Sequence, residues 1–366
     1  MGFRARRIGI LTGGGDCPGL NAVIRAVTRA ARDGYGATVF GIEDGFEGLV
    51  EGRMHELSSQ AVSGIVGLGG TILGTSSKGD PVHYPVEVSS GKIEIRDMTY
   101  KVLRNIEQWS LDALIAIGGD GTMHNARRIS DAGVGVVGVP KTIDNDVPAT
   151  EVTFGFDSAT SVVCAAIDRL ETTASSHHRV MVVEVMGRYA GWIALVGGMS
   201  SGADVILIPE IPFQWEHVYR KVHERQNQGK RFTIVCVAEG AHLPEGGVVV
   251  RATDMRRTDS KRLGGIGECV ADSIEQATSY DTRVTVLGHL QRGGSPTVAD
   301  RVLATRFGVA AADCACRGET GVMVAMHDGM VRTVSLADAT GPQRTVPPDD
   351  ELVHAARATG VSFGDA

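Results

Sequence analysis

The sequence predicts an α/β protein with two lobes, each built on a mainly parallel sheet that helices cover on both faces. Apolar runs that suit buried strands alternate along the chain with stretches of helical periodicity. These runs are almost continuously apolar, as strands buried on both faces require. The chain has 366 residues, which is too long for one compact core, so we expect two lobes.

The first expected strand, 8–12, runs into a glycine-rich segment at 13–19. The helix that follows has one apolar face, formed by Ala22, Val23, Ala26, Val27 and Ala30. Further strands are expected at 37–42, 112–118, 134–140, 180–186, 204–208, 232–238 and 283–288. A later helix presents a core stripe of Trp215, Val218, Tyr219 and Val222. Polar segments at 76–98 and 241–262 are expected to leave the sheets as excursions.

Composition favours a cytoplasmic enzyme. A formal net charge of -7 disfavours a nucleic-acid partner. We find no apolar run of about 18 residues, so we expect no membrane segment, and the N-terminus lacks the pattern of a signal peptide. The six cysteines are scattered without a close pair of the CxxC type, which fits a reducing compartment. Cys164 and Cys236 lie in apolar runs and are expected to be core residues.

The segment Pro140-Lys141-Thr142-Ile143-Asp144-Asn145-Asp146 follows the strand expected at 134–140. It would place two carboxylates and a hydroxyl at the carboxyl edge of a sheet, where open α/β sheets bind ligands. One carboxylate could accept a proton from a hydroxyl while the other holds a metal ion, as phosphoryl transfer requires. Clusters of Asn and Asp after a strand are usually turns or helix caps. From these residues alone, both interpretations stay open.

Two glycine-rich turns strengthen the catalytic interpretation. Gly118-Gly119-Asp120-Gly121-Thr122 ends another apolar strand, where Thr122 could cap the next helix and Asp120 could bind Mg²⁺ beside phosphates. In the first turn, Gly14 and Gly19 have the spacing of a P-loop. Leu20-Asn21 stands where that motif needs Lys followed by Ser or Thr, so we exclude a P-loop NTPase.

In this order, the three turns resemble the 6-phosphofructokinases. The resemblance continues through Arg179, the segments 186–192 and 238–240, and the segment 283–294. It implies a phosphofructokinase fold of Rossmann-like, three-layer lobes. The nucleotide lobe would contain 1–150 plus about 290–340, and the sugar-phosphate lobe 151–289 plus the C-terminal segment.

The resemblance implies phosphoryl transfer from MgATP to the 1-hydroxyl of fructose 6-phosphate. Asp144 resembles the family's base, Thr142 the hydroxyl that steadies the phosphoryl group, and Arg188 the arginine that neutralises its charge. The implied sugar-phosphate contacts are Thr142, Asp144, Arg179, Met186, Gly187, Arg188, Glu239, Arg283, His289 and Arg292. The implied donor contacts are Gly15, Ser77, Lys78, Gly119, Asp120, Gly121 and Thr122, with Asp120 as the metal ligand and Asp146 near the metal. Family members share Arg179 and Arg283 between subunits, which implies a homodimer or homotetramer with shared sites.

The donor is the open question, because Gly121 matches ATP-using members and Lys141 matches pyrophosphate-using ones. A side chain at 121 would block the α-phosphate, whereas a lysine can lie aside, so we expect ATP and keep pyrophosphate as the alternative. Ser77-Lys78 stands where the family commonly has an arginine. A non-catalytic sugar-phosphate sensor is disfavoured because both Asp144 and Asp120 are present.

Overall fold

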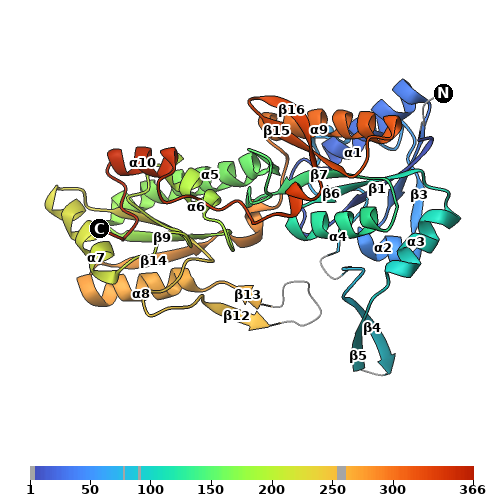
Figure 1. Cartoon of the computed structure of the whole chain (residues 1–366). Coiled ribbons are helices and arrows are strands. Elements are labelled where there is room, and N and C mark those ends of the chain that lie inside the picture. Colours follow the sequence, from blue (N-terminus) through green and yellow to red (C-terminus); the bar gives the residue numbers. More distant parts are fainter. Residues whose placement is uncertain (1–4, 77–78, 90–91, 254–260) are drawn as a thin grey trace. The chain divides into compact units, whose positions relative to one another are not determined.

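A computed structural model describes residues 5–76, 79–89, 92–253 and 261–366 (Figure 1). These residues form two units, which are described one at a time. Among the described residues, unit 1 comprises 5–76, 79–89, 92–157 and 292–343. Unit 2 comprises 158–253, 261–291 and 344–366.

Unit 1 is built on a sheet with the strand order β16-β15-β7-β6-β1-β2-β3, and β8 pairs with β7. The central strands β2, β1, β6, β7 and β15 are parallel, whereas β3 and β16 run antiparallel at the two ends. The strands are β1 (Arg7–Thr12), β2 (Thr38–Ile42), β3 (Met54–Glu56), β6 (Ala113–Gly118), β7 (Val136–Thr142), β8 (Phe154–Gly155), β15 (Val322–His327) and β16 (Met330–Ser335). Every residue of β6 is buried, which explains its continuous apolar run.

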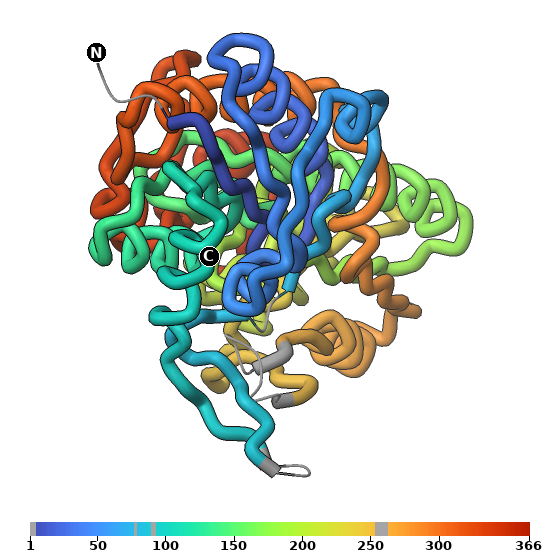
Figure 2. The backbone as a smooth tube through the Cα atoms, turned by 90° about the vertical axis from the view of Figure 1, so that its right-hand side faces the viewer, coloured from blue at the N-terminus to red at the C-terminus, as the bar shows by residue number. Residues whose placement is uncertain are grey.

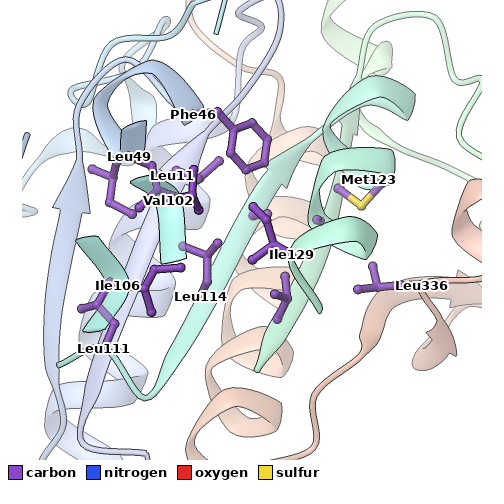
Figure 3. Close-up of a cluster of buried hydrophobic side chains, with 14 of the residues drawn as sticks. Leu11, Phe46, Leu49, Val102, Ile106, Leu111, Leu114, Met123, Ile129 and Leu336 are labelled. Atoms are coloured by element: carbon purple, nitrogen blue, oxygen red, sulfur yellow. The ribbon is translucent and has the colours of Figure 1, made fainter. Parts of the chain in front are cut away.

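Helices cover both faces of this sheet (Figure 1). One face carries α1 (Leu20–Arg29) and α9 (Val298–Arg317), which pack on each other. The other carries α2 (Phe46–Glu51), α3 (Thr99–Gln108) and α4 (Asp120–Asp131). Figure 3 shows the apolar cluster beneath these three helices, which includes Leu11, Leu49, Leu114 and Ile129. Full burial of each such side chain contributes about 1.5–3 kcal/mol, so this face stabilises the unit.

The expected excursion at 76–98 contains a β-hairpin. Strands β4 (Tyr84–Ser89) and β5 (Lys92–Arg96) pair in antiparallel orientation, apart from the main sheet. Figure 2 shows the hairpin projecting away from the helices of unit 1. Alternating apolar and charged residues in β5 suit a ribbon with exposed faces.

Unit 2 has an all-parallel sheet with the strand order β10-β11-β9-β14. Its strands are β9 (Val180–Val185), β10 (Val205–Leu207), β11 (Thr233–Ala238) and β14 (Thr282–Val286). Its helices are α5 (Phe156–His177, whose first two residues belong to unit 1), α6 (Trp192–Ser200), α7 (Trp215–Asn227), α8 (Ile266–Thr278) and α10 (Glu351–Ala358). Helix α6 packs on β10 and β11, and α8 packs on β9 and β14. The second excursion contains the antiparallel pair β12 (Val250–Thr253) and β13 (Lys261–Leu263).

The predicted fold class is confirmed, and each strand expected from 37 onward is present with its ends within two residues of the prediction. The core stripe of α7 is confirmed at Val218 and Val222, which are fully buried.

Cys236 is buried as expected, but Cys164 is partly exposed, so its assignment to the core is wrong. Its apolar neighbours lie on a helix, which also presents faces to solvent. No helix in the described part of the chain is long and apolar enough to cross a membrane.

Candidate active site

Three loops begin side by side at the carboxyl edge of the unit 1 sheet. Strands β1, β6 and β7 are parallel neighbours, with Thr12 opposite Ile117 and Gly118 opposite Pro140. The amide of Gly13 donates to the carbonyl of Ile117 at 2.8 Å, which ties the first two loops together. Glycine loops and the Thr142–Asp146 segment therefore meet at the edge where open α/β sheets bind ligands.

The side chain of Thr122 packs against both glycine loops. An ideal Cβ on Gly13 would lie 2.6 Å from Thr122 Oγ1, and one on Gly118 would lie 2.2 Å from it. Glycine is therefore required at both positions. The expectation that Thr122 caps the following helix is wrong. Helix α4 already begins at Asp120, so Thr122 lies inside its first turn, buried.

The segment after β7 is a turn that fixes the candidate base. Asn145 has a φ of 53°, in the left-handed region that Asn tolerates better than most residues. Thr142 Oγ1 accepts a hydrogen bond from the amide of Asp144 at 3.1 Å, and Asn145 Oδ1 accepts one from the amide of Thr153 at 3.0 Å. The hydroxyl of Thr153 donates to the carbonyl of Thr142 at 2.7 Å. The turn thus orients Asp144 and Asp146 from one short stretch of backbone.

The carboxylates of this edge repel one another. Burial, with the charge of Asp144 as the second cause, raises the pKa of Asp146 to about 7, and Asp120 adds to the repulsion. The hydroxyl of Thr142 bonds to Asp146 and opposes this rise, and Gln343 Nε2 donates to Asp146 Oδ2 at 3.3 Å. Burial also raises the pKa of Asp120. A nearby cation would relieve all three carboxylates.

A magnesium ion fits this edge. Asp120 Oδ1 is buried without a hydrogen-bond partner among the described residues, and lies 3.4 Å from His124 Nδ1. The described residues contain no group of three or more His, Cys, Asp or Glu side chains that could hold a metal ion by themselves. Mg²⁺ needs no such group, because it commonly binds one or two carboxylates while waters and substrate phosphates complete its shell.

Gly121 leaves space open beside Asp120. It is exposed at the second position of α4, and a Cβ built on it meets no heavy atom of the described residues within 4 Å. A side chain at this position would therefore fit the protein itself. Its effect would fall on whatever molecule occupies that space.

Lys141, the other candidate for donor specificity, is buried near the end of β7. Its Nζ donates to the carbonyl of Gly15, and a Cβ on Gly14 would lie 3.7 Å from this nitrogen. Burial lowers the pKa of Lys141. The ammonium group thus holds the glycine loop that follows β1.

A further segment, 68–76, lies on the same glycine loop. Asn21 donates to two of its carbonyls at 3.2 Å each and accepts from the amide of Ile72 at 2.9 Å. The hydroxyl of Thr75 donates to the carbonyl of Gly14 at 2.6 Å. Asn21, whose residue type excludes a P-loop, therefore joins the first turn of α1 to this segment. The predicted donor contacts Ser77 and Lys78 lie outside the described residues.

Arg292, predicted to bind the sugar phosphate, belongs to unit 1 and lies at the glycine loop. Its Nη1 donates to the carbonyl of Asp16 at 3.1 Å. An ideal Cβ on Gly15 would lie 2.7 Å from this nitrogen, so a side chain at this position would displace the guanidinium group. The loop that contains Gly15 is therefore contacted by both Arg292 and Lys141.

In unit 2, most of the predicted sugar contacts follow the carboxyl ends of β9 and β11. The amide of Met186 donates to Gln291 Oε1 at 3.3 Å, and the amide of Gly240 donates to the carbonyl of Gly187 at 3.0 Å. A Cβ on Gly240 would lie 1.9 Å from the carbonyl oxygen of Arg188, so the two loops are in close backbone contact. This contact brings Met186, Gly187, Arg188 and Glu239 to one edge of the sheet. His289, exposed in the short helix Gly288–Gln291 after β14, follows the same edge.

Arg179 and Arg283 lie at the opposite, amino-terminal edge of that sheet. Arg179 precedes β9, and Arg283 is the second residue of β14. One carboxylate bridges them: Asp281 Oδ2 accepts from Arg179 Nε, and Asp281 Oδ1 lies 2.5 Å from Arg283 Nη1. Six residues of strand separate this pair from Met186, or about 20 Å at 3.3 Å per residue. The structure therefore does not bring the predicted phosphate ligands of one chain together at one edge.

The sequence did not indicate a role for two residues that make contacts here, Asp281 and Gln291. Asp281 stands two positions before Arg283, and an Asp just before a strand is too common to indicate a role. Gln291 lies within the segment 283–294, which resembles the family. Its full burial results from the fold and could not be predicted from that segment. Its amide side chain bonds both Met186 and the carbonyl of Gly288, the latter at 3.1 Å.

Comparisons with known proteins agree with this architecture. The sequence pattern of the family described as Phosphofructokinase matches residues 7–315. The ATP-dependent 6-phosphofructokinase of Chloroflexus aurantiacus is 50% identical over 366 residues, covering 100% of this chain and 99% of the relative. The ATP-dependent 6-phosphofructokinase 2 of Clostridium perfringens is 49% identical over 361 residues, covering 98% and 99%.

Solved structures show the same fold. The T-state phosphofructokinase of Pichia pastoris superposes with a TM-score of 0.78 at 32% identity, covering 98% of this chain and 39% of that longer chain. A pyrophosphate-dependent phosphofructokinase from Nitrosospira multiformis gives a TM-score of 0.81 at 21% identity and supports the fold alone. With its family pattern, full-length relatives and fold in agreement, this chain belongs to the phosphofructokinase family.

Proposed function

We propose that this chain transfers a phosphoryl group from MgATP to the 1-hydroxyl of fructose 6-phosphate, giving fructose 1,6-bisphosphate and ADP. The observation that carries this function is the 48–50% identity, over at least 98% of the chain, to several relatives named ATP-dependent 6-phosphofructokinase. The ATP-dependent activity predicted from the sequence is thereby confirmed, and the pyrophosphate-dependent alternative is not favoured.

In the proposed mechanism, Asp144 takes the proton of the sugar's 1-hydroxyl as the oxygen attacks the γ-phosphorus. Its orientation comes from the turn in which Thr142 Oγ1 accepts the Asp144 amide. A general base within hydrogen-bond reach contributes typically ~10²–10⁴-fold to a rate. Thr142 donates to the transferring group, and the fixed fork of Arg188 neutralises the charge on its oxygens.

We assign the metal to Asp120, with Asp146 close by. The support is the buried Oδ1 of Asp120 and the pKa of Asp146, which burial and Asp144 raise to about 7. A bound Mg²⁺ would supply charge neutralisation for the phosphates of the donor. The protein's own contribution is to keep these carboxylates at one edge of the sheet, so that the cation and the donor arrive together.

Donor selection is assigned to Gly121 rather than to Lys141. The space beside Gly121 is open. A nucleotide needs this space, because its α-phosphate and nucleoside extend beyond the two terminal phosphates, whereas pyrophosphate ends there. Lys141 Nζ donates to the carbonyl of Gly15, so its charge is already engaged in holding the loop. We further propose that Gly15, Gly119 and Thr122 shape the donor pocket through backbone and packing rather than through charged contacts.

For the acceptor, we propose that the sugar binds at the carboxyl edge of the unit 2 sheet and that a second copy supplies Arg179 and Arg283. The support is their position at the opposite edge, about 20 Å away along β9. Two-fold pairing of identical chains would let each copy complete the other's site. The assembly is therefore a homodimer or a homotetramer with shared sites.

We place the reaction in the cytoplasm. All six cysteines are free thiols, among them Cys17, Cys236 and Cys316 in buried positions. Free thiols without disulfide partners are typical of compartments that glutathione and thioredoxin keep reduced.

A donor assay tests the function directly. Purified protein is supplied with fructose 6-phosphate, Mg²⁺ and either ATP or pyrophosphate, and fructose 1,6-bisphosphate is measured by coupling to aldolase. We expect product with ATP and little or none with pyrophosphate. Product with pyrophosphate alone would show that Lys141, and not Gly121, indicates the donor.

A further inference from the structure

Within unit 2, the sugar-contact loop 186–191 is anchored at both ends. Gln291 and Gly240 hold its first residues, as described above. Its last residue, Gly191, donates its amide to the carboxylate of Glu210, at 2.9 Å to Oε1 and 3.2 Å to Oε2. Gly191 directly precedes α6, so this contact sets where the loop ends and the helix begins.

Glu210 simultaneously holds the C-terminal segment of the chain. Its Oε1 accepts the amide of Val346 at 2.8 Å, and Val346 is buried. Next to this contact, Trp192 Nε1 donates to the carbonyl of Arg344 at 3.1 Å, and the guanidinium of Arg344 lies 4.2 Å from the centre of the Trp192 ring. We call Glu210, Trp192, Arg344 and Val346 the C-terminal clip.

The packing around Gly191 leaves little freedom. An ideal Cβ on Gly191 would lie 2.4 Å from Ile208 Cβ and 2.9 Å from Glu210 Oε2. Burial raises the pKa of Glu210, and the amides of Val346 and Gly191 oppose that rise by hydrogen bonding to the charged form. A half-buried carboxylate that accepts two amides would leave both unpaired if it were removed.

We propose that Glu210 is a positioning residue for fructose 6-phosphate. By tying Gly191 to the C-terminal segment, it holds loop 186–191 in the geometry in which Met186 and Arg188 contact the sugar and the transferring group. This inference rests on the proposed function, in which that loop binds the acceptor. Misplacement of a binding group by about 1 Å can cost ~10²-fold in rate, so a distant anchor can govern acceptor use.

Two substitutions at Glu210 separate positioning from charge. Glu210→Ala should raise the KM for fructose 6-phosphate by ~10-fold or more and lower kcat, while the KM for ATP changes less than ~2-fold. Glu210→Gln keeps an oxygen in the place of Oε1, which accepts both amides, and should restore the KM to near the wild-type value.

Two further variants guard against a purely structural effect. Trp192→Phe keeps an aromatic ring beside Arg344 but removes the donor to its carbonyl, and should raise the same KM by ~3-fold. Asp204→Ala is the matched control, because Asp204 is a buried carboxylate of unit 2 that accepts the amide of Ile234 at 2.9 Å and pairs with Arg225. It should lower the melting temperature without changing the KM for fructose 6-phosphate.

The proposal is supported if Glu210→Ala and Trp192→Phe both raise the acceptor KM while Asp204→Ala does not. It is overturned if Glu210→Ala and Asp204→Ala show the same acceptor KM as the wild type. If Glu210→Ala does not fold, the KM of Trp192→Phe for fructose 6-phosphate is used instead. A raised KM supports the proposal, and an unchanged KM overturns it. Wild-type protein is assayed in parallel, because its failure to phosphorylate fructose 6-phosphate would refute the proposed function and not the clip.

Discussion

The candidate residues of unit 1 gather at one edge of its sheet, whereas those of unit 2 divide between two edges. In unit 1, burial, followed by the charges of Asp144 and Asp120, raises the pKa of Asp146 to about 7. In unit 2, Arg179 and Arg283 lie at the strand starts and share the single carboxylate of Asp281. Crowded negative charge favours a bound cation at the unit 1 edge. The position of the arginine pair at the far edge of the unit 2 sheet supports the proposal that it serves the anionic substrate of a second copy.

In the proposed function the two units have different roles, so a substitution in one unit should impair donor use, proton transfer or acceptor binding separately. The largest effect is expected at Gly121. Gly121→Asp should abolish ATP-dependent activity, because the side chain enters the open space beside Asp120 and its charge repels the donor's phosphates. The same variant is also assayed with pyrophosphate, which is smaller than ATP and does not need the space beside Gly121.

Gly121→Ala provides the control for this experiment. A Cβ at this position meets nothing within 4 Å among the described residues, so both variants should keep the wild-type melting temperature. Unchanged turnover of ATP by Gly121→Asp would show that the donor does not occupy this space.

The next effect tests the base. Asp144→Asn should lower kcat by ~10²-fold or more with little change in the KM for fructose 6-phosphate, because the amide keeps the shape but accepts no proton. Asp131→Asn, at the exposed end of α4, serves as the control for a lost carboxylate in unit 1. A variant at 144 that retained most of its turnover would remove Asp144 from the mechanism.

A smaller effect tests the arginines of unit 2. Arg179→Ala or Arg283→Ala should weaken binding of fructose 6-phosphate by ~1.5–3 kcal/mol, the range for hydrogen bonds to charged groups, and leave ATP affinity nearly unchanged. Arg220→Ala is the matched control, since Arg220 makes only a wide surface pair with Glu224 at 3.8 Å among the described residues. Loss of ATP affinity with intact sugar affinity would mean that the roles of the two units are exchanged.

The last prediction concerns stability rather than activity, and is a pH dependence of the stability of unit 1. Burial and Asp144 raise the pKa of Asp146 from 3.8 to about 7, so the folded protein binds more protons than the unfolded chain between these values. Stability from this group is therefore full below about pH 4 and is lost as the pH rises through 7. Without Mg²⁺, the melting temperature of Asp146→Asn should vary less with pH over this range than that of the wild type. Identical pH profiles would contradict the assigned coupling.

Much of this arrangement could be predicted from the sequence. Apolar runs such as 112–118 identified the strands, because buried parallel strands need apolar side chains on both faces. The polar residues that directly follow those strands had to meet at one edge, which explains why Asp120 and Asp144 could be placed together from a linear pattern.

Contacts between distant residues could not be predicted in this way. Glu210 and Val346 are 136 positions apart, and neither residue has an unusual neighbourhood in the sequence. Asp281 bridges Arg179 only because β9 and β14 are neighbours in the sheet. Thr122 was wrongly expected to cap α4, because a Thr near a helix start indicates the helix but does not locate its first residue.

The most direct test of the difference between the units is subunit complementation. Arg179→Ala and Asp144→Asn chains are co-expressed, and the mixed assembly is assayed for phosphorylation of fructose 6-phosphate. If sites are shared, one site of each mixed pair is intact, and random pairing should restore about one quarter of the wild-type activity. Mixing Arg179→Ala with Arg283→Ala should restore nothing, since both defects fall on the same contributed surface. Activity of the first mixture no higher than the mean of its two parents would contradict the shared site.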